Sequence, residues 1–215
     1  MAKDAPTTSV PQGDRQDRRR RAIVETARKA FMRHGYGATT MSAIAAELGG
    51  SKTTLWSYFR NKQDLFVAVL DAMVTRYGEA LRMEPPVDGD PPEVLTMIGN
   101  SIMRTVTSPQ IVALHRMVMA EAGRSQQIGR LLWERGPMRG QAMLGGWLQA
   151  QMERGTVRVA DPLEAARHFI ALCQAGSFHR HLMGAMPKPT IEALEAEVAV
   201  AVQTFLRAYG LNGGA

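Results

Sequence analysis

The chain has 215 residues, 45% of them hydrophobic, and a formal net charge of +6. This length is sufficient for one large domain or two small ones, each with its own core. No apolar run approaches the ~18 residues of a membrane-spanning helix, and no apolar segment follows the charged N-terminus, so neither a membrane span nor a secretory signal is expected. The single cysteine, Cys173, excludes an internal disulfide and a cysteine-rich zinc site. We therefore expect a cytoplasmic protein.

The positive charge is concentrated in the first third of the chain. Residues 1–64 carry 12 basic and 6 acidic side chains, whereas residues 65–215 carry 14 of each. A basic surface suits a polyanionic partner, either a nucleic acid or an acidic membrane surface.

The chain begins with a polar segment, residues 1–17. It offers too little apolar surface to offset the entropy lost on ordering, so we expect a disordered arm. Four arginines follow at 18–21, and the sequence then becomes periodic. Ile23, Ala27 and Phe31 recur every four residues, which indicates the apolar stripe of a helix that Gly35 ends.

Three shorter helical segments are predicted next. Thr40 or Ser42 can cap the first, Ser51 the second and Asn61 the third. The residues expected to be buried on these segments are Ile44, Ala45, Leu48, Leu55, Phe59, Leu65, Phe66, Val69, Leu70 and Met73.

The third of these segments is expected to reach about Met83, where a proline-bracketed break begins. Every later segment is predicted to be helical, and Pro137 is expected to kink or split the longest of them. The later helices are expected at roughly 93–107, 109–123, 125–154, 162–184 and 190–209. The predicted fold is therefore all-α with about nine or ten helices, divided into an N-terminal domain, 18–64, and a helical domain, 65–215.

The spacing within residues 41–58 favours a helix-turn-helix. Ala45 and Gly49 are four residues apart, and Leu55 follows six residues later. A small residue lets the second helix cross the first closely, a glycine adopts the positive φ of the turn, and a large aliphatic residue joins the two helices. The second helix can then enter the major groove of DNA.

Two short core helices around a glycine are the alternative interpretation of the same spacing. The outer face of the second helix favours DNA binding, because it is polar or aromatic and has no acidic residue. It lies, moreover, in the basic part of the chain, and neutralisation of phosphate charge dominates affinity for DNA. This face consists of Lys52, Thr53, Thr54, Trp56, Ser57 and Tyr58.

Residues 18–66 resemble the DNA-binding domain of the TetR/AcrR family of transcriptional regulators. The family's pattern around the recognition helix is matched by Gly49, Ser51, Lys52, Thr54, Leu55, Tyr58, Phe59, Lys62 and Leu65. The chain departs from that pattern at Gly50, Thr53 and Trp56, which leaves the operator sequence open.

This resemblance implies that the chain binds an operator of double-stranded DNA. It assigns phosphate contacts to Thr40 and Lys62, and places the recognition helix against base edges and the adjoining backbone. The residues predicted to contact DNA are Arg18, Arg19, Thr40, Ser51, Lys52, Thr53, Thr54, Trp56, Tyr58 and Lys62.

The same resemblance implies a homodimer formed through the last two helices and a ligand pocket in the helices before them. Segments 114–122, 161–162 and 205–210 are similar to the AefR-like C-terminal branch of the family. The predicted dimer-interface residues are Phe169, Cys173, Ile191, Val198, Val202 and Phe205. The predicted pocket residues, for which plain core filling is the alternative, are Met103, Leu114, Met117, Trp133, Met143 and Trp147.

The sequence therefore predicts a dimeric transcriptional repressor that a small lipophilic effector releases from a palindromic operator. A constitutive repressor without an effector, or a regulator whose helical body binds another protein, are the alternatives. Catalysis is not expected, because no common catalytic motif is present. His179 and His181 would point ~200° apart on a helix and could not share a metal ion. No cofactor is expected.

Overall fold

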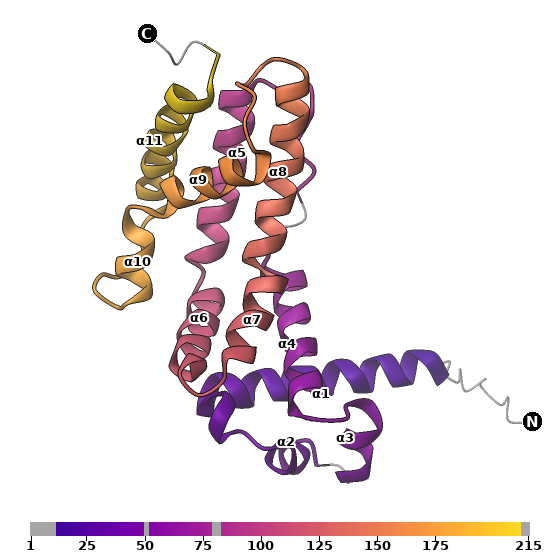
Figure 1. Ribbon diagram of the computed structural model, residues 1–215. Helices are drawn as coiled ribbons and strands as arrows, with labels where there is room; N and C mark the ends of the chain where they lie inside the picture. The colour runs from indigo at the N-terminus through magenta and orange to yellow at the C-terminus, as the bar shows by residue number, and fades with distance from the viewer. Residues whose placement is uncertain (1–11, 50–51, 79–82, 212–215) are drawn as a thin grey trace, which may run out of the picture. The chain divides into compact units, whose positions relative to one another are not determined.

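The computed structural model describes residues 12–49, 52–78 and 83–211, which form helices α1 to α11 (Figure 1). Within these ranges the β-type pairing is limited to an isolated bridge between Val157 and Gly210. The all-α prediction is thus confirmed. The chain divides into two compact units, residues 1–69 and 70–215. None of the described helices has the length and apolar character needed to cross a membrane.

The first unit contains α1 (Gln12–Ala38), α2 (Met41–Glu47), α3 (Lys52–Tyr58) and the first half of α4 (Lys62–Tyr77). The residues predicted to be buried in this unit are buried, except for Leu48, which is half-buried. Met73 and Leu70, farther along α4, are also buried as expected.

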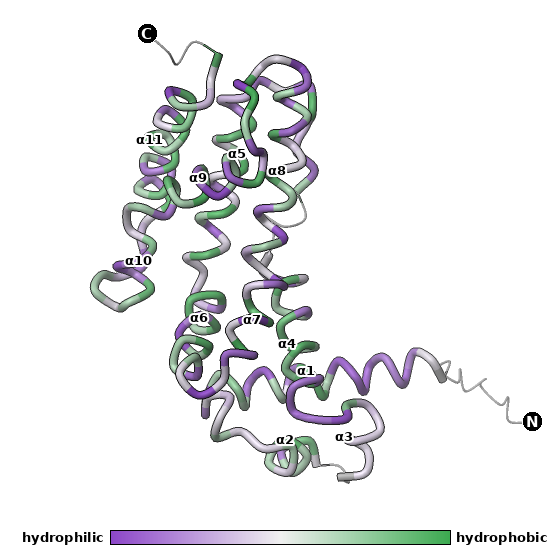
Figure 2. Tube along the Cα trace, in the orientation of Figure 1, coloured by the Kyte–Doolittle hydropathy of each residue, from purple (hydrophilic) through white to green (hydrophobic). Residues whose placement is uncertain are grey.

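Helix α1 begins earlier than predicted. Residues 12–17 were expected to be disordered, yet they are helical, and residues 1–11 lie outside the described part of the chain. Asp14 lies in the first turn, where a negative charge is favourable at the positive end of the helix dipole. Arg18 donates from Nε to the Asp14 carbonyl oxygen at 3.2 Å. The strongly hydrophilic character of this part of α1 (Figure 2) is therefore compatible with a helix whose side chains face solvent.

Helix α1 breaks at Gly35, as the sequence predicts. Its φ of 78° and ψ of 165° are not helical, and a positive φ of this size suits glycine. The hydroxyl of Thr39, which is buried, donates to the Gly35 carbonyl oxygen at 2.7 Å and fixes the chain after the break. Helix α4 ends at Tyr77, short of the expected Met83, and residues 79–82 lie outside the described residues.

The second unit contains the rest of α4 and seven further helices. They are α5 (Pro91–Val106), α6 (Pro109–Ala122), α7 (Gln126–Arg135), α8 (Pro137–Glu153), α9 (Pro162–Gln174), α10 (Ser177–Leu182) and α11 (Ile191–Tyr209). Four of these, α5, α6, α8 and α9, begin at a proline, where the missing N–H has no intrahelical partner to lose. Pro137 accordingly splits the long predicted helix into α7 and α8, as expected.

The single helix predicted at 162–184 is instead two helices, α9 and α10. The break lies at Gly176, whose φ of −87° and ψ of −109° are not helical. A Cβ added at this glycine would lie 2.5 Å from the Glu197 carboxyl carbon. Ser177 donates to the same carboxylate from its amide and its hydroxyl, at 3.0 Å and 2.8 Å. This carboxylate on α11 therefore holds the start of α10 and explains the additional helix.

The core of the second unit is formed mainly by α5, α8, α9 and α11. Phe169 and Phe205 meet edge to face at its centre, with ring centroids 5.3 Å apart. Gly99 on α5 lies against them, because a Cβ there would be 2.6 Å from Cγ1 of Val198 and 3.3 Å from Cζ of Phe169. The small residue thus permits close approach of α5 to α9 and α11.

Replacing Gly99 with alanine is expected to destabilise the chain, because the added methyl overpacks this contact at a cost of about 1–3 kcal/mol. Urea unfolding of the full chain measures the change. The matched control is Gly146→Ala on α8, where a Cβ meets nothing within 4 Å and the better helix propensity of alanine should leave stability unchanged or slightly raised. Equal stability of Gly99→Ala and wild type would contradict the close approach.

Candidate DNA-binding interface and ligand cavity

The α2–α3 segment has the geometry of a helix-turn-helix. Thr40 caps α2, its hydroxyl oxygen accepting from the Ala43 amide at 3.1 Å, and Gly49 adopts a φ of +62° in the turn. Ala45 and Leu55 are buried, as the packing of the two helices requires. The spacing that favoured this motif in the sequence is therefore realised with each residue in its predicted place.

The outer face of α3 presents polar and aromatic groups. Thr53 and Ser57 are exposed, and Trp56 is 41% exposed, although a tryptophan is usually well covered. Thr54 and Tyr58 are half-buried. Of the predicted DNA contacts in this segment, Ser51 and the Lys52 side chain lie outside the described residues.

The arginine run belongs to α1, so the helix sets the direction in which each of these side chains leaves the backbone. Arg18 is exposed and Arg19 is half-exposed, as a DNA contact requires. Arg20 has a structural contact: its guanidinium carbon lies 5.2 Å from the centre of the Phe59 ring, just after α3. This cation–π contact joins α1 to the end of the recognition helix. Sequence spacing does not predict this contact, because no spacing rule connects residues so far apart.

Lys62 has a different role from the predicted phosphate contact. Its ammonium donates to the carbonyl oxygens of Tyr36 at 2.9 Å and Gly37 at 3.4 Å, and lies 4.2 Å from the centre of the Tyr36 ring. These carbonyls belong to the short last stretch of α1, which follows the break at Gly35. The prediction is corrected accordingly: Lys62 ties the start of α4 to the end of α1.

Tyr36 is the aromatic residue that makes this connection compact. Its ring stacks on Phe31 with centroids 5.5 Å apart and meets Phe66 edge to face at 5.0 Å. The helical periodicity does not predict this role for Tyr36, because Tyr36 lies outside the apolar stripe of α1. A Gly-Tyr-Gly sequence after a helix was the available signal, since the break at Gly35 redirects the tyrosine toward Phe31 and Phe66.

The predicted dimer-interface residues are mostly internal. Phe169, Cys173, Val198 and Phe205 are fully buried, and Val202 is buried as well, whereas Ile191 is exposed. The five buried residues belong to the core of the second unit, and burial raises the pKa of the Cys173 thiol to about 12. These five assignments to the dimer interface are corrected, because side chains buried in the core of one subunit are not on its surface and cannot contact a partner.

A cavity of about 440 Å³ lies within the second unit and is lined by residues of α4 to α10. Of the six residues predicted for a ligand pocket, Leu114 and Trp133 line this cavity. Met103, Met117 and Trp147 are instead buried away from it, and Met143 packs on the core. Trp147 shows the reason, since its indole N–H donates to the Pro86 carbonyl oxygen at 3.0 Å and fastens the loop before α5 to α8.

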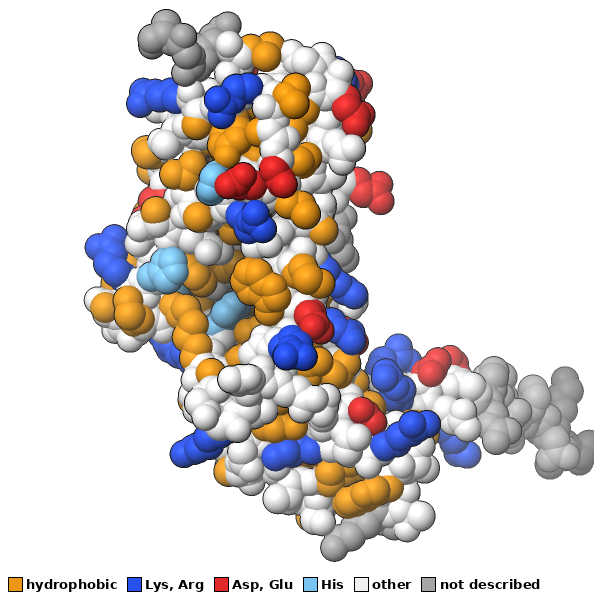
Figure 3. Space-filling view, viewed as in Figure 1, with side chains coloured by type: hydrophobic (Ala, Val, Ile, Leu, Met, Phe, Trp, Pro, Cys, Tyr) orange, Lys and Arg blue, Asp and Glu red, His pale blue; other side chains and the backbone are white. Residues whose placement is uncertain are grey.

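The polar groups of the cavity wall were not predicted. They are Arg167, Gln141, Gln174, Thr105, His115 and His179. His115 is the most enclosed of the titratable ones: burial lowers its pKa, and a hydrogen bond to the Ile111 carbonyl oxygen opposes the shift. Figure 3 shows histidine side chains among hydrophobic ones on the face beside α6 and α10.

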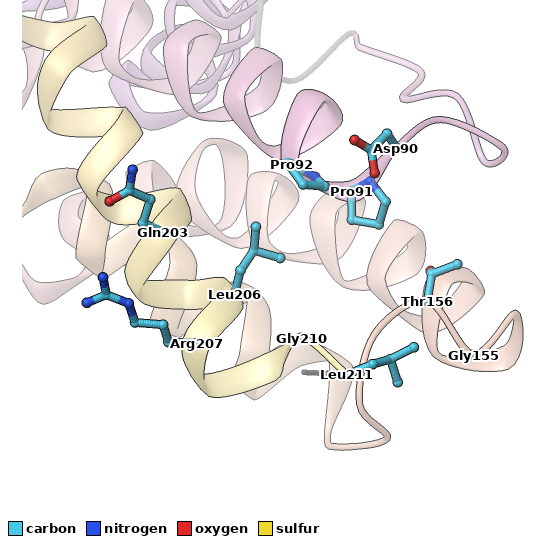
Figure 4. A pocket seen from close by; sticks show the side chains of 10 residues that line it. All are labelled: Asp90, Pro91, Pro92, Gly155, Thr156, Gln203, Leu206, Arg207, Gly210 and Leu211. Carbon is cyan, nitrogen blue, oxygen red and sulfur yellow. The ribbon is translucent and has the colours of Figure 1, made fainter. Parts of the chain in front are cut away.

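A second depression, of about 660 Å³, lies where α11 ends. Figure 4 shows that its side chains come from separate places: Pro91 and Pro92 start α5, Thr156 lies in the turn after α8, and Gln203 and Arg207 lie on α11. Although its volume is larger, fewer elements surround it. The cavity lined by α4 to α10 is therefore the better candidate for enclosing a small molecule.

Two family descriptions match this chain, one over the helix-turn-helix and one over the helical second unit. Residues 23–69 match the family described as bacterial regulatory proteins, tetR family. Residues 93–211 match the AefR-like transcriptional repressor C-terminal domain. The chain belongs to the TetR family. It is thus a DNA-binding transcriptional regulator.

This TetR-family regulator is also similar to individual curated relatives. It is 40% identical over 59 residues to the transcriptional repressor ComR of Escherichia coli, covering 27% of this chain and 28% of ComR. It is 24% identical over 183 residues to the regulator YvkB of Bacillus subtilis, covering 84% of this chain and 94% of YvkB. The match spans 28% of the length of ComR, well under two thirds of it.

Among solved structures, the flavonoid-responsive regulator FrrA is similar over almost the whole chain. The TM-score is 0.82 at 28% identity, with 91% of this chain and 99% of FrrA covered. A TetR-family structure from Mesorhizobium loti has a TM-score of 0.76 at 24% identity, covering 92% of this chain and 99% of that one, and shows the shared fold.

The corrected role of Lys62 predicts that Lys62→Met lowers stability while leaving DNA electrostatics unchanged. Loss of the charged donor removes its hydrogen bonds to the Tyr36 and Gly37 carbonyl oxygens, at a cost of about 1–2 kcal/mol. Urea unfolding measures this, and the dependence of DNA affinity on salt should keep its wild-type slope. Lys29→Met, at an exposed lysine of α1, is the matched control for stability. If Lys62→Met were as stable as wild type and its DNA affinity depended less steeply on salt, Lys62 would instead be a phosphate contact, as first predicted.

Proposed function

We propose that this TetR-family protein is a cytoplasmic, dimeric repressor that binds a palindromic operator and is released from it by a small lipophilic effector. The observation that carries the proposal is the exposed, acid-free outer face of α3, on a helix-turn-helix whose turn has the required positive φ. It lies in the part of the chain that holds the entire surplus of positive charge.

Contacts to DNA are proposed for side chains of α3, of α1 and of Thr40, the residue that caps α2. Thr53 and Trp56 on α3 are exposed and contact bases or the sugar-phosphate backbone in the major groove. Arg18 and Arg19 contact phosphates from α1, and the Thr40 hydroxyl, which accepts from the Ala43 amide, still has its proton to donate to a phosphate. Ser51, Lys52, Thr54 and Tyr58 complete the proposed set.

The dimer is proposed to form through the outer faces of α9 and α11. Small residues line an apolar groove of about 410 Å³ between these helices, among them Ala171, Ala175, Thr204 and Ala208. Such residues let helices of a second copy approach closely. Val200 on α11 is 64% exposed, unusual for a valine, which supports cover by the partner. Ile191 stays in the proposed interface.

The effector is proposed to occupy the cavity lined by α4 to α10. Its mainly apolar wall supports a lipophilic ligand, and its presence favours an effector-responsive regulator over a constitutive one. The similarity to FrrA, whose name describes it as flavonoid-responsive, supports a ligand of comparable size. Helix α4 contributes Val74 to the cavity and Lys62 to the first unit, so α4 transmits the effect of effector binding to the DNA-binding unit.

DNA binding is tested with the region upstream of the chain's own gene by fluorescence anisotropy. We expect Trp56→Ala to weaken operator binding by about tenfold or more, because a lost base or backbone contact costs about 1–3 kcal/mol. The matched control is Met97→Ala, a large apolar side chain of α5 that is 42% exposed against 41% for Trp56 and does not line the cavity. Unchanged affinity in Trp56→Ala, or no operator binding by wild type at any salt concentration, contradicts the proposal.

The dimer face is tested with Val200→Glu, which places a charge at the proposed interface. We expect a monomer in analytical ultracentrifugation and a loss of operator affinity, since a palindrome requires two linked recognition helices. Val159→Glu, at an 81% exposed valine in the loop after α8, is the control and should remain dimeric. A dimeric Val200→Glu protein would place the interface elsewhere.

A further inference from the structure

The cavity lined by α4 to α10 has a positively charged side chain, that of Arg167, on its wall. Arg167 on α9 lies on its wall and makes no hydrogen bond or ion pair with the described residues. No aspartate or glutamate belongs to the described lining. Asp71, on the neighbouring part of α4, is bound to Arg135 in an ion pair at 2.5 Å and does not line the cavity.

Hydrogen-bonding groups on the same wall add donors and neutral acceptors. His115 Nδ1 lies 2.8 Å from the Ile111 carbonyl oxygen and His179 Nδ1 lies 3.2 Å from that of Gln174. Because a carbonyl oxygen can only accept, each Nδ1 carries a proton, and burial of His115 lowers its pKa and favours the neutral ring, in which Nε2 is an acceptor. The amides of Gln141 and Gln174 supply further donors.

We propose that the effector is a lipophilic acid, an apolar molecule carrying a carboxylate or an ionised phenol that pairs with Arg167. The inference deepens the proposed function and rests on the cavity being its effector site. The apolar wall, to which Leu114, Leu132, Trp133 and Ile170 contribute, covers the body of the ligand. A hydroxyl elsewhere on the ligand donates to Nε2 of His115.

The same arrangement disfavours lipophilic cations. An ammonium group in the cavity would meet the Arg167 guanidinium and would find no carboxylate among the described lining residues. A neutral ligand of the same shape keeps the apolar contacts but loses the charge-assisted hydrogen bond. Selectivity should therefore follow the charge of the ligand in the order anion, neutral molecule, cation.

The test compares three ligands with one apolar body: biphenyl-4-carboxylate, biphenyl-4-methanol and the biphenyl-4-methylammonium ion. Isothermal titration calorimetry of the full chain without DNA measures each Kd. We expect the carboxylate to bind about fivefold more tightly than the alcohol, a factor suited to a partly exposed ion pair, and the ammonium ion to bind more weakly than the alcohol.

Variants assign the preference to the proposed residue. Arg167→Gln should make the carboxylate and the alcohol bind equally, whereas Arg167→Lys should keep the preference. Arg130→Gln, an exposed arginine of α7 outside the cavity, should behave as wild type. A fold control by circular dichroism accompanies each variant.

Three results overturn the inference: alcohol or ammonium binding as tightly as the carboxylate, no binding of any of the three, or an unchanged preference in Arg167→Gln. The proposed function fails separately. Carboxylate binding that depends on Arg167 but leaves the operator complex intact sustains the inference and rejects effector release. Release of the operator by the ammonium ion alone sustains effector release and rejects the inference.

Discussion

The DNA-binding unit depends on the ammonium group of Lys62. After the break in α1, this one charged donor binds the carbonyl oxygens of both Tyr36 and Gly37. Its position over the Tyr36 ring adds a cation–π contact, and the ring in turn packs on Phe31 and Phe66. The end of α1 and the start of α4 are thereby held together.

Local patterns in the sequence predicted this unit well. The spacing of Ala45, Gly49 and Leu55 is short-range, and each residue is confirmed in its predicted environment. The role of Lys62 could not be predicted in the same way. It depends on carbonyl groups 25 and 26 residues away, which point toward the ammonium only because Gly35 redirects the backbone.

The second unit shows a different limit. An apolar stripe is required both for a helix buried in its own subunit and for one that faces a partner, so Phe169 and Val198 were assigned to the wrong environment. Methionine content was similarly ambiguous, since Met103 fills the core and does not line the cavity. The split between α9 and α10 depends on Glu197, a residue of another helix, and no local signal at Gly176 specified it.

Because Lys62, Ala45 and Leu55 face inward, the stability of the first unit and its proposed operator preference are carried by different side chains. Thr53 and Trp56, where the chain departs from the family's usual residues, are exposed and contribute little to the core. Such an arrangement lets the recognition surface diverge between relatives at small cost to folding. Duplicated genes of this kind could acquire new operators by a few substitutions on α3 while the scaffold beneath remains unchanged.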